Sequence, residues 1–120
     1  MAFAFQCPGK EVQYEYRIEN ATELTLKIAM GSELKILEPH ASTTYSYADY
    51  DGRWNVFDHV IGSLGTCSVF SDDKLLKTWT MNGRNDGGKQ LFNVYSWTYD
   101  SPKAFHMTYT FEISPEDLGL

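Results

Sequence analysis

The sequence has no long apolar run and fewer cationic than anionic side chains. None of its segments approaches the roughly 18 consecutive apolar residues that a membrane span requires. Ten Lys and Arg residues stand against sixteen Asp and Glu, so the formal net charge of the 120 residues is −6. Binding to nucleic acid needs a basic face that lies along the phosphates. We therefore expect neither a membrane span nor a nucleic acid as the main partner.

Cysteine is scarce, since only Cys7 and Cys67 are present. A disulfide between them would close a long loop and contribute about 4 kcal/mol in the chain-entropy model. We favour the alternative, in which Cys67 is a small buried residue of a strand and Cys7 is a free thiol near a mobile end. The sequence has no C-x-x-C motif and no nearby pair of histidines. No metal site and no cofactor are therefore predicted.

The first ten residues lack the basic region and the apolar length of a signal peptide. Cys7 stands where a lipid-anchor cysteine could sit, but Ala4-Phe5-Gln6 before it is a poor lipoprotein cleavage sequence. We expect residues 1–10 to be a flexible segment, with a lipid anchor as the less favoured alternative. Residues 11–120 contain no linker, repeat or low-complexity run, so we expect them to form a single domain.

Alternation of apolar and polar residues dominates the chain. Even positions are apolar from Glu11 to Glu19, and the pattern resumes over 24–30 after a short turn. These neighbouring segments are predicted to pair as an antiparallel hairpin. Further strands are predicted over 34–37, 43–47, 66–71 and 74–81, the last with Leu75, Trp79 and Met81 on one face.

Two more segments complete this pattern. Phe57, Val60, Ile61 and Leu64 have helical spacing, which predicts a turn or two of helix or an irregular crossover. A final hairpin is predicted between 91–99 and 105–113, whose odd positions from Phe105 to Ile113 would form one wall of the core. Seven or eight short strands indicate an all-β, antiparallel two-sheet sandwich, in preference to a small barrel. We expect its core between the first and last hairpins.

The sequence shows no recognisable set of catalytic residues. His40, His59 and His106 stand alone, and the chain has no H-E-x-x-H motif, no G-x-S-x-G motif and no phosphate-binding glycine loop. We therefore predict no enzyme and no catalytic residues. An enzyme that uses carboxylates such as Asp49, Asp51 and Asp58 is the least favoured alternative.

Three polar motifs are expected to be structural. Asp49-Tyr50-Asp51-Gly52 resembles half of a calcium loop, but Val60 occupies the position that needs glutamate, so we expect a turn. Asn20-Ala21-Thr22 matches a glycosylation acceptor at a point where the chain has to turn. The glycine-rich segment 82–88 is predicted to be an exposed loop rather than an anion site.

Aromatic residues are the best material for binding, since 8 Tyr, 7 Phe and 3 Trp are present. Tyr45, Tyr47, Tyr50 and Trp54 lie in a region without clean alternation, so some of these rings are expected at the surface. Exposed Tyr and Trp rings stack on sugars or anchor protein partners. The alternative is that these four rings fill one end of the core.

Four segments of the sequence form a set of motifs: YEYRIENAT at 14–22, SVFSDDK at 68–74, NVYSW at 93–97 and YTFEISPED at 109–117. Together they resemble a group of small Bacteroidetes lipoproteins of unknown function, over about two thirds of the chain. The chain departs from the pattern at Ser71, at Lys74, which no glycine precedes, and at Leu118. The resemblance implies an immunoglobulin-like sandwich in the cell envelope or outside the cell, and it brings no catalytic residues.

We thus expect a non-catalytic envelope or surface domain that binds a protein or a glycan. A small carbohydrate-binding module that uses Tyr45, Tyr47, Tyr50 and Trp54 is the more specific alternative. Its requirement is that at least two of these rings lie exposed in one plane.

Overall fold

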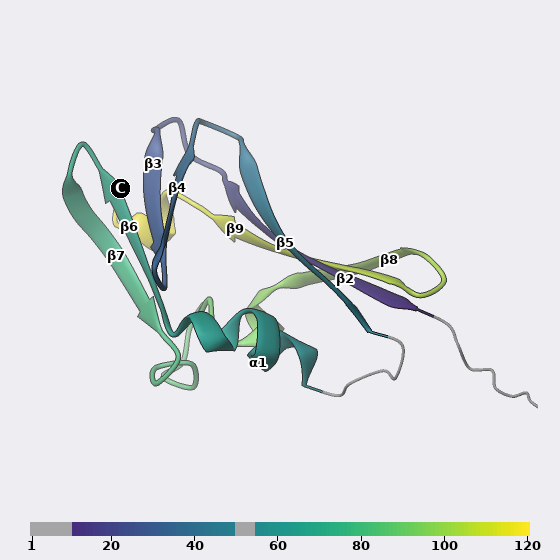
Figure 1. Ribbon diagram of the computed structural model, residues 1–120. Coiled ribbons are helices and arrows are strands. Elements are labelled where there is room, and N and C mark those ends of the chain that lie inside the picture. The colour runs from purple at the N-terminus through teal and green to yellow at the C-terminus, as the bar shows by residue number, and fades with distance from the viewer. Residues whose placement is uncertain (1–10, 50–54) are drawn as a thin grey trace, which may run out of the picture.

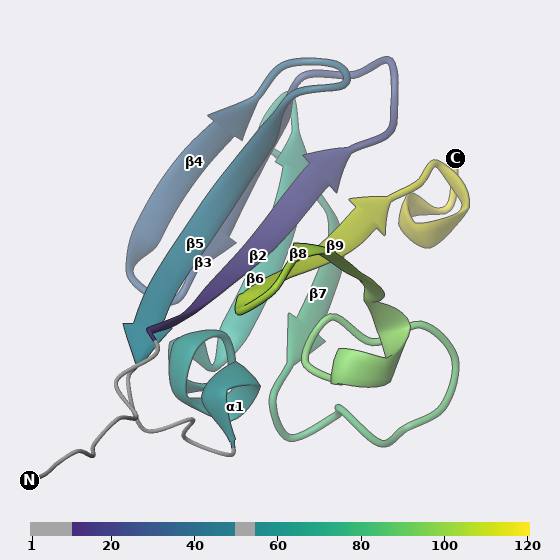
Figure 2. The same cartoon turned by 90° about the vertical axis from the view of Figure 1, so that its right-hand side faces the viewer.

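The computed structural model describes residues 11–49 and 55–120, which fold into two four-stranded sheets packed face to face (Figure 1 and Figure 2). The first sheet has the strand order β5-β2-β9-β8 and the second the order β4-β3-β6-β7. Neighbouring strands are antiparallel except β2 and β9, which run parallel. The predicted all-β sandwich is confirmed, with one parallel pair that the sequence pattern did not indicate.

The elements have the following bounds. The first sheet contains β2 (Val12–Asn20), β5 (Ser42–Asp49), β8 (Thr98–Lys103) and β9 (His106–Ile113). The second contains β3 (Leu26–Met30), β4 (Glu33–Leu37), β6 (Thr66–Ser71) and β7 (Lys74–Thr80). The connections contain the short helices α1 (Val56–Val60), η1 (Gly62–Leu64) and η2 (Val94–Ser96), and η3 (Glu116–Leu118) follows β9. Within the described ranges, no helix combines the length and the apolar content that crossing a bilayer requires.

The core lies between the sheets, where alternate residues of each strand point inward. Its largest fully buried side chains include Tyr16 and Phe111 from the first sheet and Trp79 from the second. Burying one such side chain stabilises the fold by about 1.5–3 kcal/mol. Segments outside the strands also contribute buried side chains to this core, namely Val56, Phe57, Ile61, Leu91, Phe92, Trp97 and Leu118.

The predicted hairpin between 11–19 and 24–30 is wrong, because the chain changes sheets between them. β2 pairs with β5 and β9, whereas β3 pairs with β4 and β6. The core is accordingly formed between two sheets and not between two hairpins, and the short turn that suggested pairing is a crossover from one sheet to the other.

The side chain of Asn20, which has no exposed surface, fixes this crossover. Its Oδ1 accepts a hydrogen bond from the backbone N–H of Thr22 at 2.9 Å. Its Nδ2 donates to the carbonyls of Leu24 (2.7 Å), Leu37 (3.0 Å) and Glu38 (3.1 Å). Asn20 therefore joins the β2–β3 connection to the β4–β5 connection, and it satisfies buried backbone groups that both crossovers leave without a strand partner.

The last hairpin is shorter than the sequence pattern predicts. Residues 91–97 form turns and η2 instead of a strand, so the pairing of β8 with β9 begins only at Thr98. Phe105, predicted on the core face, is 46% exposed and has a φ of 63°, because it lies in the turn before β9. Only Phe111 and Ile113 of the predicted wall are buried, while Met107 and Tyr109 are half-buried.

A β-bulge changes the predicted inner face of β7. Val69 pairs with Lys77, but the next residue, Phe70, pairs with Leu75, so Leu76 is an extra residue in β7. Leu75 therefore points outward and is 53% exposed, whereas Leu76 packs against the core. Trp79 lies on the other side of the bulge from Leu75, so it keeps its predicted face and is buried. A single inserted residue moves every side chain beyond it to the other face of the strand.

Other local predictions agree with the structure. The helical spacing of Phe57 to Leu64 corresponds to α1 and η1, with Phe57 and Ile61 buried. Segment 82–88 is a largely exposed loop. Cys67 is a buried free thiol, and burial raises its pKa to about 12. Cys7 and the remainder of 1–10 lie outside the described residues.

Candidate functional site

The first sheet extends beyond the second at one end (Figure 1). Tyrosines of β2 and β9 lie on its inner face there. Along β2, Ile18 and Tyr16 are fully buried, whereas Tyr14 is half-buried. Along β9, Phe111 is fully buried and Tyr109 is half-buried. Tyrosine suits this position because its ring packs like an apolar side chain while its hydroxyl reaches water.

A hollow of about 320 Å³ lies between this end of the sheet and α1. We call it the tyrosine groove. β2 and β9 form one side of it, and the residues around α1 and η2 form the other. Its lining consists of Tyr14, Tyr16, Asn55, Val56, Phe57, Val94, Met107 and Tyr109. Pockets of about 300 Å³ and above are typical of small-molecule sites, so the groove is at the lower limit of that range.

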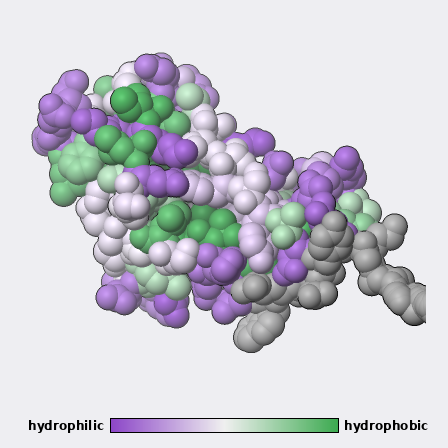
Figure 3. Space-filling model, in the orientation of Figure 1, coloured by the Kyte–Doolittle hydropathy of each residue, from purple (hydrophilic) through white to green (hydrophobic). Residues whose placement is uncertain are grey.

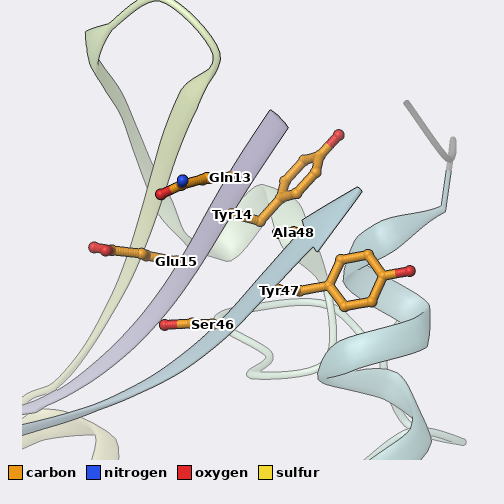
Figure 4. Close-up of a pocket in the computed structure, with 6 residues that line it drawn as sticks. All are labelled: Gln13, Tyr14, Glu15, Ser46, Tyr47 and Ala48. Carbon is orange, nitrogen blue, oxygen red and sulfur yellow. The ribbon is translucent and has the colours of Figure 1, made fainter. Parts of the chain in front are cut away.

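Ring contacts hold the tyrosines of the groove in place. Tyr109 stacks on Tyr16 with the ring centroids 5.1 Å apart, and Tyr99 covers it from β8 at 4.9 Å. Tyr14 lies beside Tyr47 of β5, with centroids 6.4 Å apart. Figure 4 shows these two rings pointing to the same side of the strands, whereas Gln13, Glu15 and Ser46 point to the other.

The tyrosine hydroxyls of the groove remain protonated at neutral pH. Burial is the main cause that raises the pKa of Tyr14 and of Tyr109, and the charges of neighbouring groups add to both shifts. Burial also raises the pKa of Tyr16 strongly. Each hydroxyl can therefore both donate and accept a hydrogen bond over the whole physiological range.

A second hollow of about 310 Å³ adjoins the groove, with which it shares Asn55, Phe57 and Val94. We call it the polar hollow. Its other lining residues are Asp58, Arg84, Asn85, Phe92, Asn93 and Tyr95. Among the described residues of this lining there is one cation and one anion, so their charges balance. Amide, carboxylate and guanidinium groups offer donors and acceptors that suit paired hydroxyl groups.

Tyr95 stands out from this lining because it is 93% exposed. It occupies the middle of η2, where the Asn93 side chain accepts a hydrogen bond from its backbone N–H at 3.0 Å. Phe92 before this turn and Trp97 after it are buried, and the Trp97 indole donates to the Leu91 carbonyl at 2.7 Å. The turn therefore holds a fully solvated ring on a rigid base.

Asn55, shared by both hollows, has an unusual backbone. Its φ is 129° and its ψ is 30°, which L residues rarely adopt, and its side chain does not cap α1. Such a conformation costs about 1–3 kcal/mol and persists only when the surrounding structure imposes it.

The four aromatic residues singled out in the sequence lie at the edge of this site or outside the described residues. Tyr45 and Tyr47 are half-buried and belong to the inner face of β5. The hydroxyl of Tyr45 is buried, and burial together with the Glu33 carboxylate raises its pKa. Tyr47 packs on His59 of α1, with centroids 5.1 Å apart. Tyr50 and Trp54 lie outside the described residues, so their participation stays a prediction.

The other motifs do not assemble into a chemical site among residues 11–49 and 55–120. The amide nitrogen of Asn20 is buried and hydrogen-bonded, so this acceptor triplet is unavailable for glycosylation in the folded chain. His40 contacts Glu23 at 2.8 Å on the surface, whereas His59 packs against Tyr47. No group of three or more His, Cys, Asp or Glu side chains in these ranges could hold a metal ion.

Sequence reasoning named Phe57 and Asp58 but missed the site function of the other residues that line the two hollows. Tyr14 and Tyr109 were assigned to the core by alternation, which cannot show where the second sheet ends. Tyr95 was placed in a strand that the structure replaces with η2. The one available signal was composition, since tyrosine occupies apolar positions at 14, 16 and 109 where a dry core favours aliphatic residues.

The outer face of the second sheet carries a smaller apolar feature. Ile36 and Leu75 are 63% and 53% exposed, and Phe70 lies between them in the same row. The ion pair of Lys27 with Asp73, at 3.2 Å, interrupts this row. Figure 3 likewise shows apolar and polar areas interspersed over β4. Dispersed apolar residues of this kind are ordinary on protein surfaces.

Comparisons with known proteins leave the site to be interpreted from its own geometry. No family model matches the chain. Neither a curated protein nor a solved structure gives a match.

Proposed function

We propose that this chain is a non-catalytic binding domain that holds a carbohydrate in the tyrosine groove. The observation that carries the proposal is the lining of that groove, in which the half-buried rings of Tyr14 and Tyr109 lie beside the buried rings of Tyr16 and Phe57 at an open hollow of about 320 Å³. The apolar face of a sugar ring stacks on aromatic side chains, while its hydroxyls bond to groups at the rim. Asn55 and the tyrosine hydroxyls supply those groups.

The chemistry of the lining favours binding over catalysis. Among the described residues that line the tyrosine groove, there is no carboxylate, thiol or imidazole. General acid–base or nucleophilic chemistry would require such a group within hydrogen-bond reach of a substrate. Ring contacts and raised hydroxyl pKa values keep the groove in a fixed, neutral form that suits recognition.

Location in the cell envelope or outside the cell belongs to the same proposal. It is supported by the resemblance to Bacteroidetes lipoproteins, together with the immunoglobulin-like character that this resemblance implies. A glycan-binding domain would meet its ligand in that compartment.

Titration calorimetry with soluble glucan, mannan and xylan would test the proposal, with Tyr14→Ala as the decisive variant. Tyr14 is half-buried and lines the groove, so its removal should weaken binding at least tenfold while the fold persists. Phe105→Ala is the matched control, because this ring is 46% exposed near the same end of the sheet but lines neither hollow. Its affinity should stay within twofold of the parent.

Two results would overturn the proposal. One is the absence of binding to these polysaccharides and to a broad glycan array. The other is a Tyr14→Ala variant that binds as well as the parent. Capture of a peptide ligand by the same groove, lost on Tyr14→Ala, would assign the site to a protein partner instead.

A further inference from the structure

We infer that the ligand of this site is an extended oligosaccharide of neutral sugars, which runs from the tyrosine groove into the polar hollow and stacks on Tyr95. This inference rests on the proposed function and deepens it. It assigns a ligand length, a ligand charge and a second aromatic contact, none of which follows from the tyrosine groove alone.

The length follows from the continuity of the two hollows. They have volumes of about 320 and 310 Å³ and share Asn55, Phe57 and Val94 along their common edge. Each alone is at the lower limit for a ligand site, whereas together they lie well within the usual range. A single sugar would leave one of them filled with water, so a chain of several rings fits the shape better.

The charge follows from the side chains around the polar hollow. Arg84 and Asp58 both line it and carry opposite charges, and the whole chain has a net charge of −6. A polyanionic glycan would meet long-range repulsion from such a protein. A neutral chain avoids this cost, and its neighbouring hydroxyls match the paired oxygens of Asp58 and the guanidinium fork of Arg84.

The role of Tyr95 follows from its exposure and its rigid base. The ring is 93% exposed, yet the backbone beneath it is held by the Asn93 side chain and lies between buried Phe92 and Trp97. Because the backbone is fixed before binding, only the two side-chain torsions of the ring have to be ordered when a ligand stacks on it. Asn93 is also tied to the 82–88 loop, because its amide donates to the Arg84 carbonyl at 3.0 Å. This hydrogen bond therefore connects the segment that carries Tyr95 to the loop that carries Arg84.

The test is calorimetry with β-1,4-linked oligomers of glucose, mannose and xylose, each from one to six rings long. The affinity for the preferred sugar should rise at least tenfold between one and four rings and then level off. Tyr95→Ala should remove most of this gain while leaving the affinity for the shortest bound oligomer within twofold. Tyr14→Ala should weaken oligomers of every length.

Phe105→Ala serves as the matched control, since Phe105 is also an exposed aromatic residue, at 46%, but lines neither hollow. It should preserve the dependence on length. Far-ultraviolet circular dichroism and thermal unfolding of all three variants would show that each remains folded. Tyr95 in particular can be removed with little effect on stability, because its side chain is almost entirely in water.

The outcomes separate the inference from the proposed function. Binding that does not depend on length, or a full gain with length in Tyr95→Ala, would overturn the inference and leave the proposed function standing. Tighter binding of oligogalacturonate than of the neutral oligomers would overturn the assigned charge. Absence of binding to every oligomer would remove both.

Discussion

The two ends of the first sheet bury the same face of the same strands in different ways. At one end, Ile18, Phe111 and Ile113 face the second sheet and have no exposed surface. At the other, Tyr14 and Tyr109 face α1 and η2 across an open hollow. We call these the dry end and the tyrosine end. The dry end fixes the fold, while the tyrosine end keeps an aromatic surface within reach of a ligand.

The difference teaches how a small sandwich can stabilise itself and still bind. A domain of this size has a total stability of about 5–15 kcal/mol, most of which must come from tightly packed residues. Rings that contact solvent on one side contribute less to stability and remain free to meet a partner. Because stability depends on one end of the sheet and binding on the other, residues that bind a ligand do not also have to be tightly packed.

The largest effect is expected from Asn20→Asp at the dry end. The substitution keeps the shape but replaces the donating amide with a carboxylate, which would face the carbonyls of Leu24, Leu37 and Glu38. Loss of buried hydrogen bonds together with a buried unpaired charge should cost about 5 kcal/mol, or prevent folding. Urea unfolding would measure the loss.

Asn82→Asp is the matched control, because Asn82 lies in the exposed loop. This exchange should change the free energy of unfolding by less than about 0.5 kcal/mol. Equal effects of the two substitutions would show that the Asn20 side chain does not hold the two crossovers together.

Truncation of one ring at each end compares them directly. Phe111→Ala at the dry end should cost about 3–5 kcal/mol, because Phe111 is fully buried and contacts Trp79 at 5.2 Å between ring centroids. Tyr14→Ala at the tyrosine end should cost only about 1 kcal/mol, since that ring is half-buried. Chemical denaturation of both variants gives the difference.

Thr110→Ala completes this comparison, because Thr110 is the neighbour of Phe111 on the opposite face of β9. It should alter the free energy of unfolding by less than about 0.5 kcal/mol. Should Phe111→Ala and Tyr14→Ala prove equally costly, the division of the sheet into a dry end and a tyrosine end would be untenable.

A smaller effect is expected from pH, through the ion pair of Lys89 with Asp117 at 2.6 Å. Partial burial of Asp117 opposes its ionisation, but hydrogen bonds from Lys89 and Ser114 outweigh this and lower its pKa below the ordinary value of 3.8. The unfolded state therefore takes up a proton first as the pH falls. The stability that this carboxylate contributes is present above about pH 4 and is lost as the pH drops through the folded pKa.

Asp117→Asn tests this contribution. The parent should be more stable than the variant by about 1–2 kcal/mol near neutral pH, which is typical of a hydrogen bond to a charged group. The difference should shrink below pH 4 and stay constant between pH 5 and 8. Thermal unfolding from pH 2 to pH 8 would measure it, and a difference that grows as the pH falls, or that is unchanged between pH 7 and pH 2, would contradict the assigned pKa direction.

The sequence allowed the sandwich to be predicted because alternation reports which face of a strand is apolar. Alternation does not show which strands pair with one another. The crossover after Asn20, which places β2 and β3 in different sheets, depends on side-chain hydrogen bonds to carbonyls many residues away. The bulge at Leu76 likewise depends on the partner strand. The candidate site could not be predicted, because Tyr14 and Tyr109 match core positions in their pattern and differ only in what lies opposite them.

The smallest expected effect has opposite signs for stability and for binding, and it concerns Asn55 at the tyrosine end. Glycine adopts a φ of 129° without the clash that a side chain causes, so Asn55→Gly should relieve strain and raise the stability by about 0.5–1 kcal/mol. The same change removes the amide that both hollows share, so binding of the preferred glycan should weaken severalfold. Asn85→Gly is the control: Asn85 lines only the polar hollow and does not have a positive φ, so added flexibility should lower its stability by a few tenths of a kcal/mol. Thermal unfolding and calorimetry on both variants decide the matter. A fall in stability for Asn55→Gly would mean that the backbone at Asn55 is not strained, and that rigidity at the tyrosine end comes from the rings alone.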